Sequence, residues 1–407
     1  MCKDGNKRFG ANRMILLKNG RIYPISQPAF QGDVLIRDGK IAALGKNIEA
    51  SDATCIDASG CTITPGFIDA HCHIGMWEDG MGDEGADGNE TSDPITPQMR
   101  AIDGLNPFDP CFHEACAAGI TTVVTGPGSA NVIGGQFAAL KTHGTSVENM
   151  LVKAPVAMKA AMGENPKQVY GTQKVTPYTR MAIAALFRKA MFDAQEYAAE
   201  KKKAESDPDK KPDMDMAMEA LLPVLSGELL LKVHAHRADD ILTALRIARE
   251  FHLRISLEHC TEGHLIVNEL KSQIDVLGGV PVILGPLLSE RSKVELRNLT
   301  FRAPAILKRA GIEFALMTDH PVIPIQFLPI CAALAVREGL DEETALASIT
   351  LHAARAVGLD GQIGSLDVGK DADLAMFSGH PFDFRARCTM TMINGQIVYR
   401  EERESER

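Results

Sequence analysis

The pattern of apolar and polar positions divides the chain into a middle part and two ends of different character. In the middle, over about residues 66–356, short apolar runs that suit buried strands alternate with amphipathic segments that suit helices, which indicates a parallel β/α architecture. The expected strands are 62–68, 121–125, 137–142, 151–159, 229–234, 254–257, 280–284 and 313–317. The count matches the strand number of a (β/α)8 TIM barrel, an α/β fold.

Both ends of the chain carry the pattern of hairpins. Asn19-Gly20, Asp38-Gly39 and Asn394-Gly395 each lie between apolar runs, as is typical of two-residue turns that join antiparallel strands. Isolated hairpins are marginally stable, so these strands need a shared core. We therefore predict one small β-sandwich domain built from residues 1–65 and 357–407, into which a barrel domain of residues 66–356 is inserted.

The helix signals are clear in four places, and one long segment has no periodicity. Helices are expected over 239–251, 301–309, 329–338 and 341–357. Residues 77–109 are instead acidic and rich in glycine. A loop of this length after the first barrel strand is typical of a lid or of a wall that shapes the substrate site. The alternative is a disordered surface loop.

Composition restricts the classes of function. The chain of 407 residues has a formal net charge of -10, which argues against a nucleic-acid surface. Its nine cysteines are scattered without a Cys-x-x-Cys pair, as expected of reduced thiols in a cytoplasmic protein. Residues 1–12 contain no apolar run typical of a secretory signal, and no stretch is long and apolar enough for a transmembrane helix.

Two histidines follow the first predicted barrel strand, in the stretch Pro65-Gly66-Phe67-Ile68-Asp69-Ala70-His71-Cys72-His73. Side chains two positions apart on a strand point to the same side, so His71 and His73 would face one point. Two converging imidazoles suit a divalent metal ion. A pair of surface histidines is the alternative, and the residues at the later strand ends argue against it.

Later strands end in the same kinds of side chain, at the barrel face that carries active sites. Residues of metal-ligand or substrate-binding type at or after these ends are Lys159, Glu164, Lys167, His234, His236, Arg237, His259, Asp319 and His320. A single histidine in an apolar strand is usually a core residue. Several strands that all end in histidine or aspartate at one face are difficult to explain by packing alone.

These features resemble the metal-dependent amidohydrolase superfamily, in its imidazolonepropionase-like and dipeptidase-like branch. The resemblance extends over nearly the whole chain. It rests on Lys18-Asn19-Gly20-Arg21-Ile22, on the stretch from Pro65 to His73, on the strand-end histidines and aspartate, and on Gly364-Ser365-Leu366-Asp367-Val368-Gly369-Lys370-Asp371-Ala372-Asp373-Leu374. It implies a (β/α)8 barrel with a β-sandwich formed by both termini, as the patterns predict.

The resemblance also implies roles for individual residues. His71, His73, His234, His259 and Asp319 match the family's metal ligands. Asp319 would also shuttle protons, and His259 would either bind metal or polarise the substrate. Two-metal members carry a carboxylated lysine or a glutamate between the ions, for which Lys159 and Glu164 are candidates. One or two divalent ions are expected, zinc first, with manganese or iron as alternatives.

The implied reaction is hydrolysis of an amide C–N bond in a small molecule, such as a cyclic amide, an N-acyl amino acid or a dipeptide. Glu164, Lys167, His236, Arg237 and His320 are candidates for substrate binding. Hydrolytic deamination of a ring is an alternative, but Glu258 is expected to point away from His259 on a regular strand, which disfavours it. A metal-free scaffold is a further alternative, and a homo-oligomer is left open.

Overall fold

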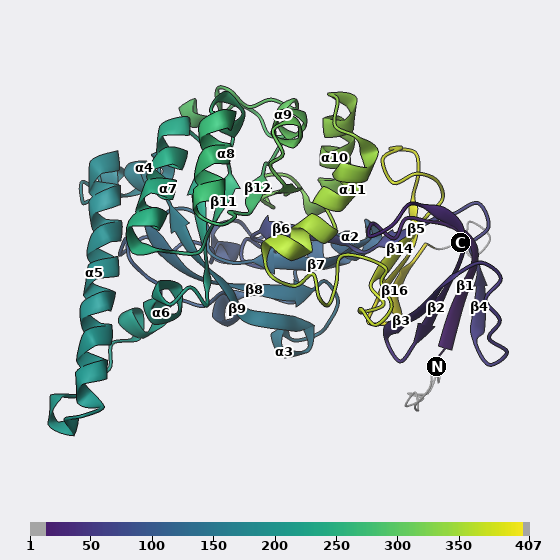
Figure 1. The fold of residues 1–407 in the computed structure, drawn as a ribbon, viewed down its shortest axis with the longest axis horizontal. Helices are drawn as coiled ribbons and strands as arrows, with labels where there is room; N and C mark the ends of the chain where they lie inside the picture. The colour runs from purple at the N-terminus through teal and green to yellow at the C-terminus, as the bar shows by residue number, and fades with distance from the viewer. Residues whose placement is uncertain (1–13, 402–407) are drawn as a thin grey trace.

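Eight strands from the middle of the chain form one sheet that curls into a nearly closed barrel (Figure 1). The computed structural model describes residues 14–401, so the segment 1–12, in which we expect no signal sequence, lies outside the described residues. The barrel strands are β6 (Phe67–Cys72), β7 (Ile120–Thr125), β8 (Ile133–Lys141), β9 (Leu151–Ala161), β10 (Leu230–Ala235), β11 (Ile255–His259), β12 (Val282–Leu284) and β13 (Phe314–Leu316). The backbone N–H of His73 donates to the carbonyl of His320 at 2.8 Å, which joins the first and last strand ends.

One barrel strand departs from the predicted parallel order. Strand β8 pairs antiparallel with both β7 and β9, whereas the other neighbouring strands pair in parallel. A parallel pair needs a crossover of a dozen or more residues. The connections 126–132 and 142–150 on either side of β8 are shorter than that, so the strand reverses its direction.

Helices cover the outside of the barrel strands (Figure 1). They are α1 (Ala101–Gly104), α2 (Cys111–Ala117), α3 (Val147–Met150), α4 (Glu164–Thr172), α5 (Arg180–Ala204), α6 (Met216–Leu225), α7 (Ala238–Phe251), α8 (Val267–Val276), α9 (Ala303–Arg309), α10 (Leu328–Arg337), α11 (Glu342–Ser348) and α12 (Leu351–Ala356). The predicted helix over 341–357 is interrupted between α11 and α12, where the carbonyl of Ile349 accepts the N–H of Ile68 at 2.8 Å. Within residues 14–401, no helix combines the length and the apolar character that crossing a membrane requires.

The two ends of the chain share a second sheet beside the barrel (Figure 1). Its strands are β1 (Met14–Ile22), β2 (Phe30–Arg37), β3 (Lys40–Gly45), β4 (Thr54–Asp57), β5 (Thr62–Pro65), β14 (Leu374–Phe377), β15 (Cys388–Ile393) and β16 (Gln396–Arg400). Strand β14 pairs antiparallel with β5, which joins the C-terminal strands to the N-terminal ones. An apolar cluster with members from both ends fills its core, consistent with the predicted terminal sandwich.

Two predictions at these strands need correction. Asn19-Gly20 is not a hairpin turn, because β1 runs through it with a register shift between Leu17 and Gly20, where Asn19 has φ 64°. The other two expected hairpins, at Asp38-Gly39 and Asn394-Gly395, are confirmed. The run 62–68 is two strands, β5 and β6, in different sheets. The chain changes sheet at Gly66, where a Cβ would overlap the side chain of Thr121.

A buried lysine links the barrel to the terminal sheet. Lys141, at the end of β8, is 5% exposed, and its Nζ lies 2.9 Å from Asp371 Oδ2 and in contact with Asp373 Oδ2. Asp371 also accepts from Lys40 Nζ at 2.7 Å, and Asp373 Oδ1 accepts from the N–H of Asn394 at 2.8 Å. The two aspartates of Asp371-Ala372-Asp373 therefore bind the side chain of Lys141 from the barrel and hold it beside the terminal sheet.

We predict that Lys141→Met lowers the free energy of unfolding by about 3–5 kcal/mol, because two buried carboxylates lose their shared cation. Denaturant unfolding followed by circular dichroism measures the change. Lys189→Met is the control, since Lys189 pairs with Asp193 on the surface and its loss should change stability by less than about 1 kcal/mol. Equal effects of the two substitutions would contradict the role of Lys141.

Candidate metal and catalytic site

Predicted ligand residues from five barrel strands converge at one end of the barrel. His71 lies in β6 and His73 just after it, Lys159 lies in β9, His234 in β10 and His259 at the end of β11. Asp319 follows β13. A cavity of about 320 Å³ opens beside them, and its lining includes His73, His234, His236, Asp319, Trp77 and Lys293. The structure therefore brings together all six residues that the sequence indicates as metal ligands.

The first group of side chains surrounds the carboxylate of Asp319. Its Oδ1 lies 3.2 Å from His73 Nε2 and 3.6 Å from His71 Nε2. Lys159 Nζ lies 3.0 Å from the same nitrogen of His71. His71 and Lys159 are fully buried, whereas the Asp319 side chain is 14% exposed. Asp319 and His73, which both line the cavity, are thus the members of this group that a molecule in the cavity can contact.

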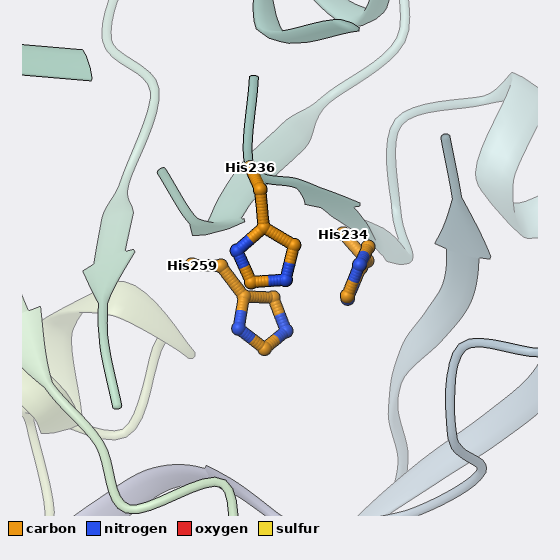
Figure 2. Close-up of side chains that lie close together, drawn as sticks. All are labelled: His234, His236 and His259. Carbon is orange, nitrogen blue, oxygen red and sulfur yellow. The ribbon is translucent and has the colours of Figure 1, made fainter. Parts of the chain in front are cut away.

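The second group consists of three histidine rings that face one another (Figure 2). The ring centroids of His234 and His259 are 4.2 Å apart, and the ring of His236 lies 4.6 Å from His234 and 4.4 Å from His259. One nitrogen from each ring lies within 4.8 Å of the others. His236, which the sequence indicates as a substrate-binding residue, is therefore part of a three-histidine cluster, although β10 ends before it.

Most of these rings are anchored through Nδ1, which leaves Nε2 directed at the site. The Nδ1 partners are Glu258 Oε2 for His71 (2.6 Å), the Gly126 carbonyl for His73 (2.7 Å), Thr261 Oγ1 for His236 (2.8 Å) and the Gly285 carbonyl for His259 (3.0 Å). Partners of this kind orient metal-binding histidines. His234 differs, because neither of its ring nitrogens has a hydrogen-bond partner within residues 14–401, although the residue is buried.

Burial controls the charge of these side chains. It is the main cause that holds the pKa of His71, His234, His236 and His259 well below the usual value, so the rings are neutral at pH 7. Neutral imidazole is the form that binds metal. Burial also lowers the pKa of Lys159 to about 8.

Two of the site residues adopt a backbone conformation that is unusual for them. His259 has φ 69° and Asp319 has φ 54°, both in the left-handed region that disfavours residues other than glycine. Strain of this kind persists where the surrounding structure imposes it, often at functional sites. At His259 the positive φ ends the alternation of side-chain directions along β11.

The positive φ at His259 overturns the expected direction of Glu258. Glu258 is fully buried, and its Oε2 lies 2.6 Å from His71 Nδ1 and 2.9 Å from Lys232 Nζ. Glu258 thus supports His71 of the first group, while the adjacent His259 belongs to the second group. Lys232 went unnoticed in the sequence, although it precedes His234 by two positions, and strand alternation places both on one side.

Four residues that the sequence indicates as substrate-binding candidates lie outside the two groups. Lys167 is exposed on α4, and Arg237 pairs with Asp239 at 2.8 Å, so neither is among the residues that line the cavity. Glu164 is not beside the metal-ligand candidates of either group, because its Oε2 accepts the N–H of Glu295 at 3.3 Å. His320 is buried and lies near Asp109 and Cys111, behind Asp319.

Sequence reasoning also missed Glu295 and Lys293, in the loop after β12. Glu295 is fully buried, with Oε1 3.6 Å from His236 Nε2 and 3.8 Å from His234 Nε2. Lys293 lines the cavity and donates to Asn165 Oδ1 at 2.8 Å. The sequence around them has no periodicity or motif that marks them. Trp77 and Asn89, by contrast, also line the cavity and come from the long loop that the sequence indicates as a substrate-shaping wall.

The first group fits a divalent ion. Zinc is bound in a tetrahedron at about 2.0–2.2 Å, so two ligand atoms of one ion lie about 3.3–3.6 Å apart. The separations from Asp319 Oδ1 to His73 and His71 are 3.2 and 3.6 Å. Imidazole nitrogen and carboxylate oxygen suit zinc, and also manganese or iron.

Comparisons with known proteins agree with this arrangement. A sequence model of the amidohydrolase family matches residues 226–399. The crystal structure of an amidohydrolase from Thermotoga maritima MSB8 is similar with a TM-score of 0.92 and 44% sequence identity, over 95% of this chain and 100% of that one.

Two curated proteins match nearly the whole chain. The amidohydrolase tasK of Hapsidospora irregularis is 30% identical over 394 residues, which are 90% of this chain and 40% of that protein. The adenine deaminase of Bacillus licheniformis is 27% identical over 393 residues, 94% of this chain and 57% of that protein. The chain therefore spans about two fifths to three fifths of the length of these relatives.

We predict that Glu258→Gln weakens zinc binding by about 10- to 100-fold, because Glu258 orients His71 and makes its ring a better ligand. Competition with a chelator measures the dissociation constant. Glu250→Gln, an equivalent change at a surface ion pair with Arg188, is the control and should leave zinc affinity unchanged. Wild-type affinity in Glu258→Gln would show that His71 needs no such partner.

Proposed function

Because the chain belongs to the metal-dependent amidohydrolase superfamily, we propose that it hydrolyses an amide C–N bond of a small molecule at this site. The observation that carries the proposal is the position of Asp319. Its carboxylate lies beside His71 and His73, at the wall of the cavity, where a substrate can reach it. A carboxylate in that position can accept a proton from attacking water and pass it to the leaving nitrogen.

The proposed ligands of the divalent ion or ions are His71, His73, Lys159, His234, His259 and Asp319. A bound ion would polarise a carbonyl and make water more acidic. The protein itself supplies imidazoles, most of them held in place by their Nδ1 partners, and a carboxylate that moves the proton. The position of Lys159 Nζ, 3.0 Å from His71 Nε2, supports Lys159 as the candidate for the carboxylated lysine.

The cavity favours a substrate with a negatively charged group. Lys293, about one third exposed, lines the cavity with Asn165, Ser129 and Ser292. An ammonium group among hydroxyl and amide side chains can bind a carboxylate. Lys293 is therefore the candidate for substrate binding in place of Lys167 and Arg237, which the sequence suggested. Among the expected substrates, N-acyl amino acids and dipeptides carry such a carboxylate.

Hydrolytic deamination is the alternative, since an adenine deaminase is among the relatives. The candidate acid for that reaction would be Glu258, but both of its oxygens are occupied. Oε2 contacts His71 and Lys232, and Oε1 accepts from Ser256 Oγ. Glu258 is also fully buried and is not among the residues that line the cavity, so it cannot contact a substrate there. It therefore supports His71 rather than acting as the acid of a deaminase, and amide hydrolysis is the favoured reaction.

We predict that Asp319→Asn lowers kcat by about 10²- to 10⁴-fold on the amide substrate that a panel of N-acetyl amino acids, dipeptides and cyclic amides identifies. The amide side chain cannot accept the proton. Circular dichroism and thermal unfolding check that the fold is kept, and Asp103→Asn at an exposed ion pair is the control. Near wild-type turnover in Asp319→Asn would contradict the mechanism.

We predict that Lys159→Ala loses bound metal and activity, and that short carboxylic acids partly restore both by replacing the carboxylated side chain. Elemental analysis and turnover with added acetate or propionate measure the two effects. Lys153→Ala, at an exposed position on the same strand, should retain both metal and activity. Unchanged metal content in Lys159→Ala would exclude the bridging role.

A further inference from the structure

We infer that Asp109, Cys111 and His320 form a separate cation site, suited to zinc, where the end of the long loop 77–109 meets the residue that follows Asp319. The proposed amide hydrolysis uses none of these three side chains, and they are not among the residues that line the cavity. The inference therefore goes beyond the proposed function and does not depend on it. It gives His320 a ligand role in place of substrate binding.

Ligand-type atoms from separate parts of the chain meet at this place. One oxygen of Asp109, the sulfur of Cys111 and one ring nitrogen of His320 all lie within 4.8 Å of one another. The exposed fractions of the three residues are 2%, 3% and 3%, so all are buried. Asp109 ends the long loop, Cys111 is the first residue of α2, and His320 follows β13. Carboxylate, thiolate and imidazole are the side-chain types that bind zinc in proteins.

The ring of His320 indicates a ligand at this place. Both of its nitrogens are buried, and neither has a hydrogen-bond partner within residues 14–401. Buried polar groups in native proteins almost always have a partner, so this ring requires an explanation. Its backbone is fixed, because its N–H donates to Thr318 Oγ1 at 3.1 Å and its carbonyl accepts the N–H of His73 at 2.8 Å. An ion shared with Cys111 and Asp109 would give the ring its partner.

Asp109 supplies the negative charge that a cation site needs. Its Oδ2 accepts the N–H of Gly75 at 3.1 Å, and its Oδ1 accepts the N–H of Cys111 at 3.0 Å. These bonds orient the carboxylate, but no lysine or arginine within residues 14–401 forms an ion pair with it. A buried carboxylate without a cation is costly. A divalent ion would supply the missing positive charge.

The spacing is compatible with one ion. Zinc binds sulfur at about 2.3 Å and nitrogen or oxygen at about 2.0–2.2 Å, so two of its ligand atoms lie roughly 3.3–3.6 Å apart. Small rotations of three side chains that already lie within 4.8 Å bring them to that spacing. Cys111 would bind as the thiolate and release its proton to solvent. Water would take the fourth position of the tetrahedron.

An ion here would connect the segments that carry the first group of side chains. Asp109 is bonded to Gly75, two residues after His73. His320 directly follows Asp319, and its carbonyl is bonded to the N–H of His73. The ion would therefore hold the strand ends of His73 and Asp319 from behind, and would fix the end of the long loop to them.

The test is a Co²⁺ titration, followed by absorption spectroscopy, of protein from which metal has been removed. Cobalt takes the same kinds of ligand as zinc, and cobalt bound to a thiolate absorbs strongly in the near ultraviolet, whereas cobalt bound only to histidine and aspartate does not. Wild type should develop this thiolate band. Cys111→Ser should lose the band and one ion per chain, counted by elemental analysis, while the remaining metal is retained.

His320→Asn is the second, independent variant. It keeps the thiol but removes the ring, so the ion that produces the band should bind about 10-fold more weakly or not at all. Circular dichroism checks the fold of both variants, and His320→Asn decides the matter if Cys111→Ser fails to fold. Wild-type affinity in His320→Asn would contradict the role of the ring.

Cys116→Ser is the matched control. Cys116 is buried in the same helix, α2, but its Sγ lies 3.3 Å from Thr142 Oγ1 and it does not belong to the group of Asp109, Cys111 and His320. It should keep the band. Absence of the band in wild type at saturating Co²⁺, or its persistence in Cys111→Ser, would overturn the inference. Amide hydrolysis without the band would leave the proposed function standing, and the band without amide hydrolysis would refute that function alone.

Discussion

The buried carboxylate of Glu258 is the interaction on which the arrangement of the site depends. It lies 2.6 Å from His71 Nδ1 and 2.9 Å from Lys232 Nζ, in an interior that water does not reach. A charge in such a place must be paired and hydrogen-bonded, so the ring and the lysine cannot turn away without a large penalty. Because Nδ1 of His71 donates to Glu258, its Nε2 is left as the atom that faces Lys159 and Asp319. Lys232 also donates to the carbonyl of Ala70 at 3.1 Å, next to His71 in the chain.

Much of this arrangement could be predicted because it follows from strand periodicity. Apolar runs located seven barrel strands, and the start of the eighth, β6, at the end of the run 62–68. Alternation placed His71 and His73 at one side of β6. The barrel closure then brings strand ends together, so residues such as His234 and Asp319 meet although they are far apart in the chain. The alternation of side-chain directions could not predict which residue has a positive φ. At His259 the backbone departs from the strand, and therefore Glu258 and His259 both face inward.

The other features that the sequence did not predict have different physical causes. The direction of β8 depends on the length of its connections, which the apolar runs alone do not show. Glu295 lies in a single turn of 3-10 helix after β12, which is too short for a repeat of apolar and polar residues to indicate which side chains turn inward. Gly66 and the Asp371-Ala372-Asp373 motif were recognised by resemblance alone. The structure gives their physical reasons, which are close contact with Thr121 and the pairing of Lys141 with both aspartates.

The distribution of charge favours a divalent ion beside Asp319. Lys232 Nζ lies 2.9 Å from Glu258 Oε2, so the carboxylate behind His71 already has a buried cation. Asp319, by contrast, directs its Oδ1 at the rings of His71 and His73, at 3.6 and 3.2 Å. A divalent ion between this carboxylate and the two rings would stabilise the carboxylate more strongly than the rings alone.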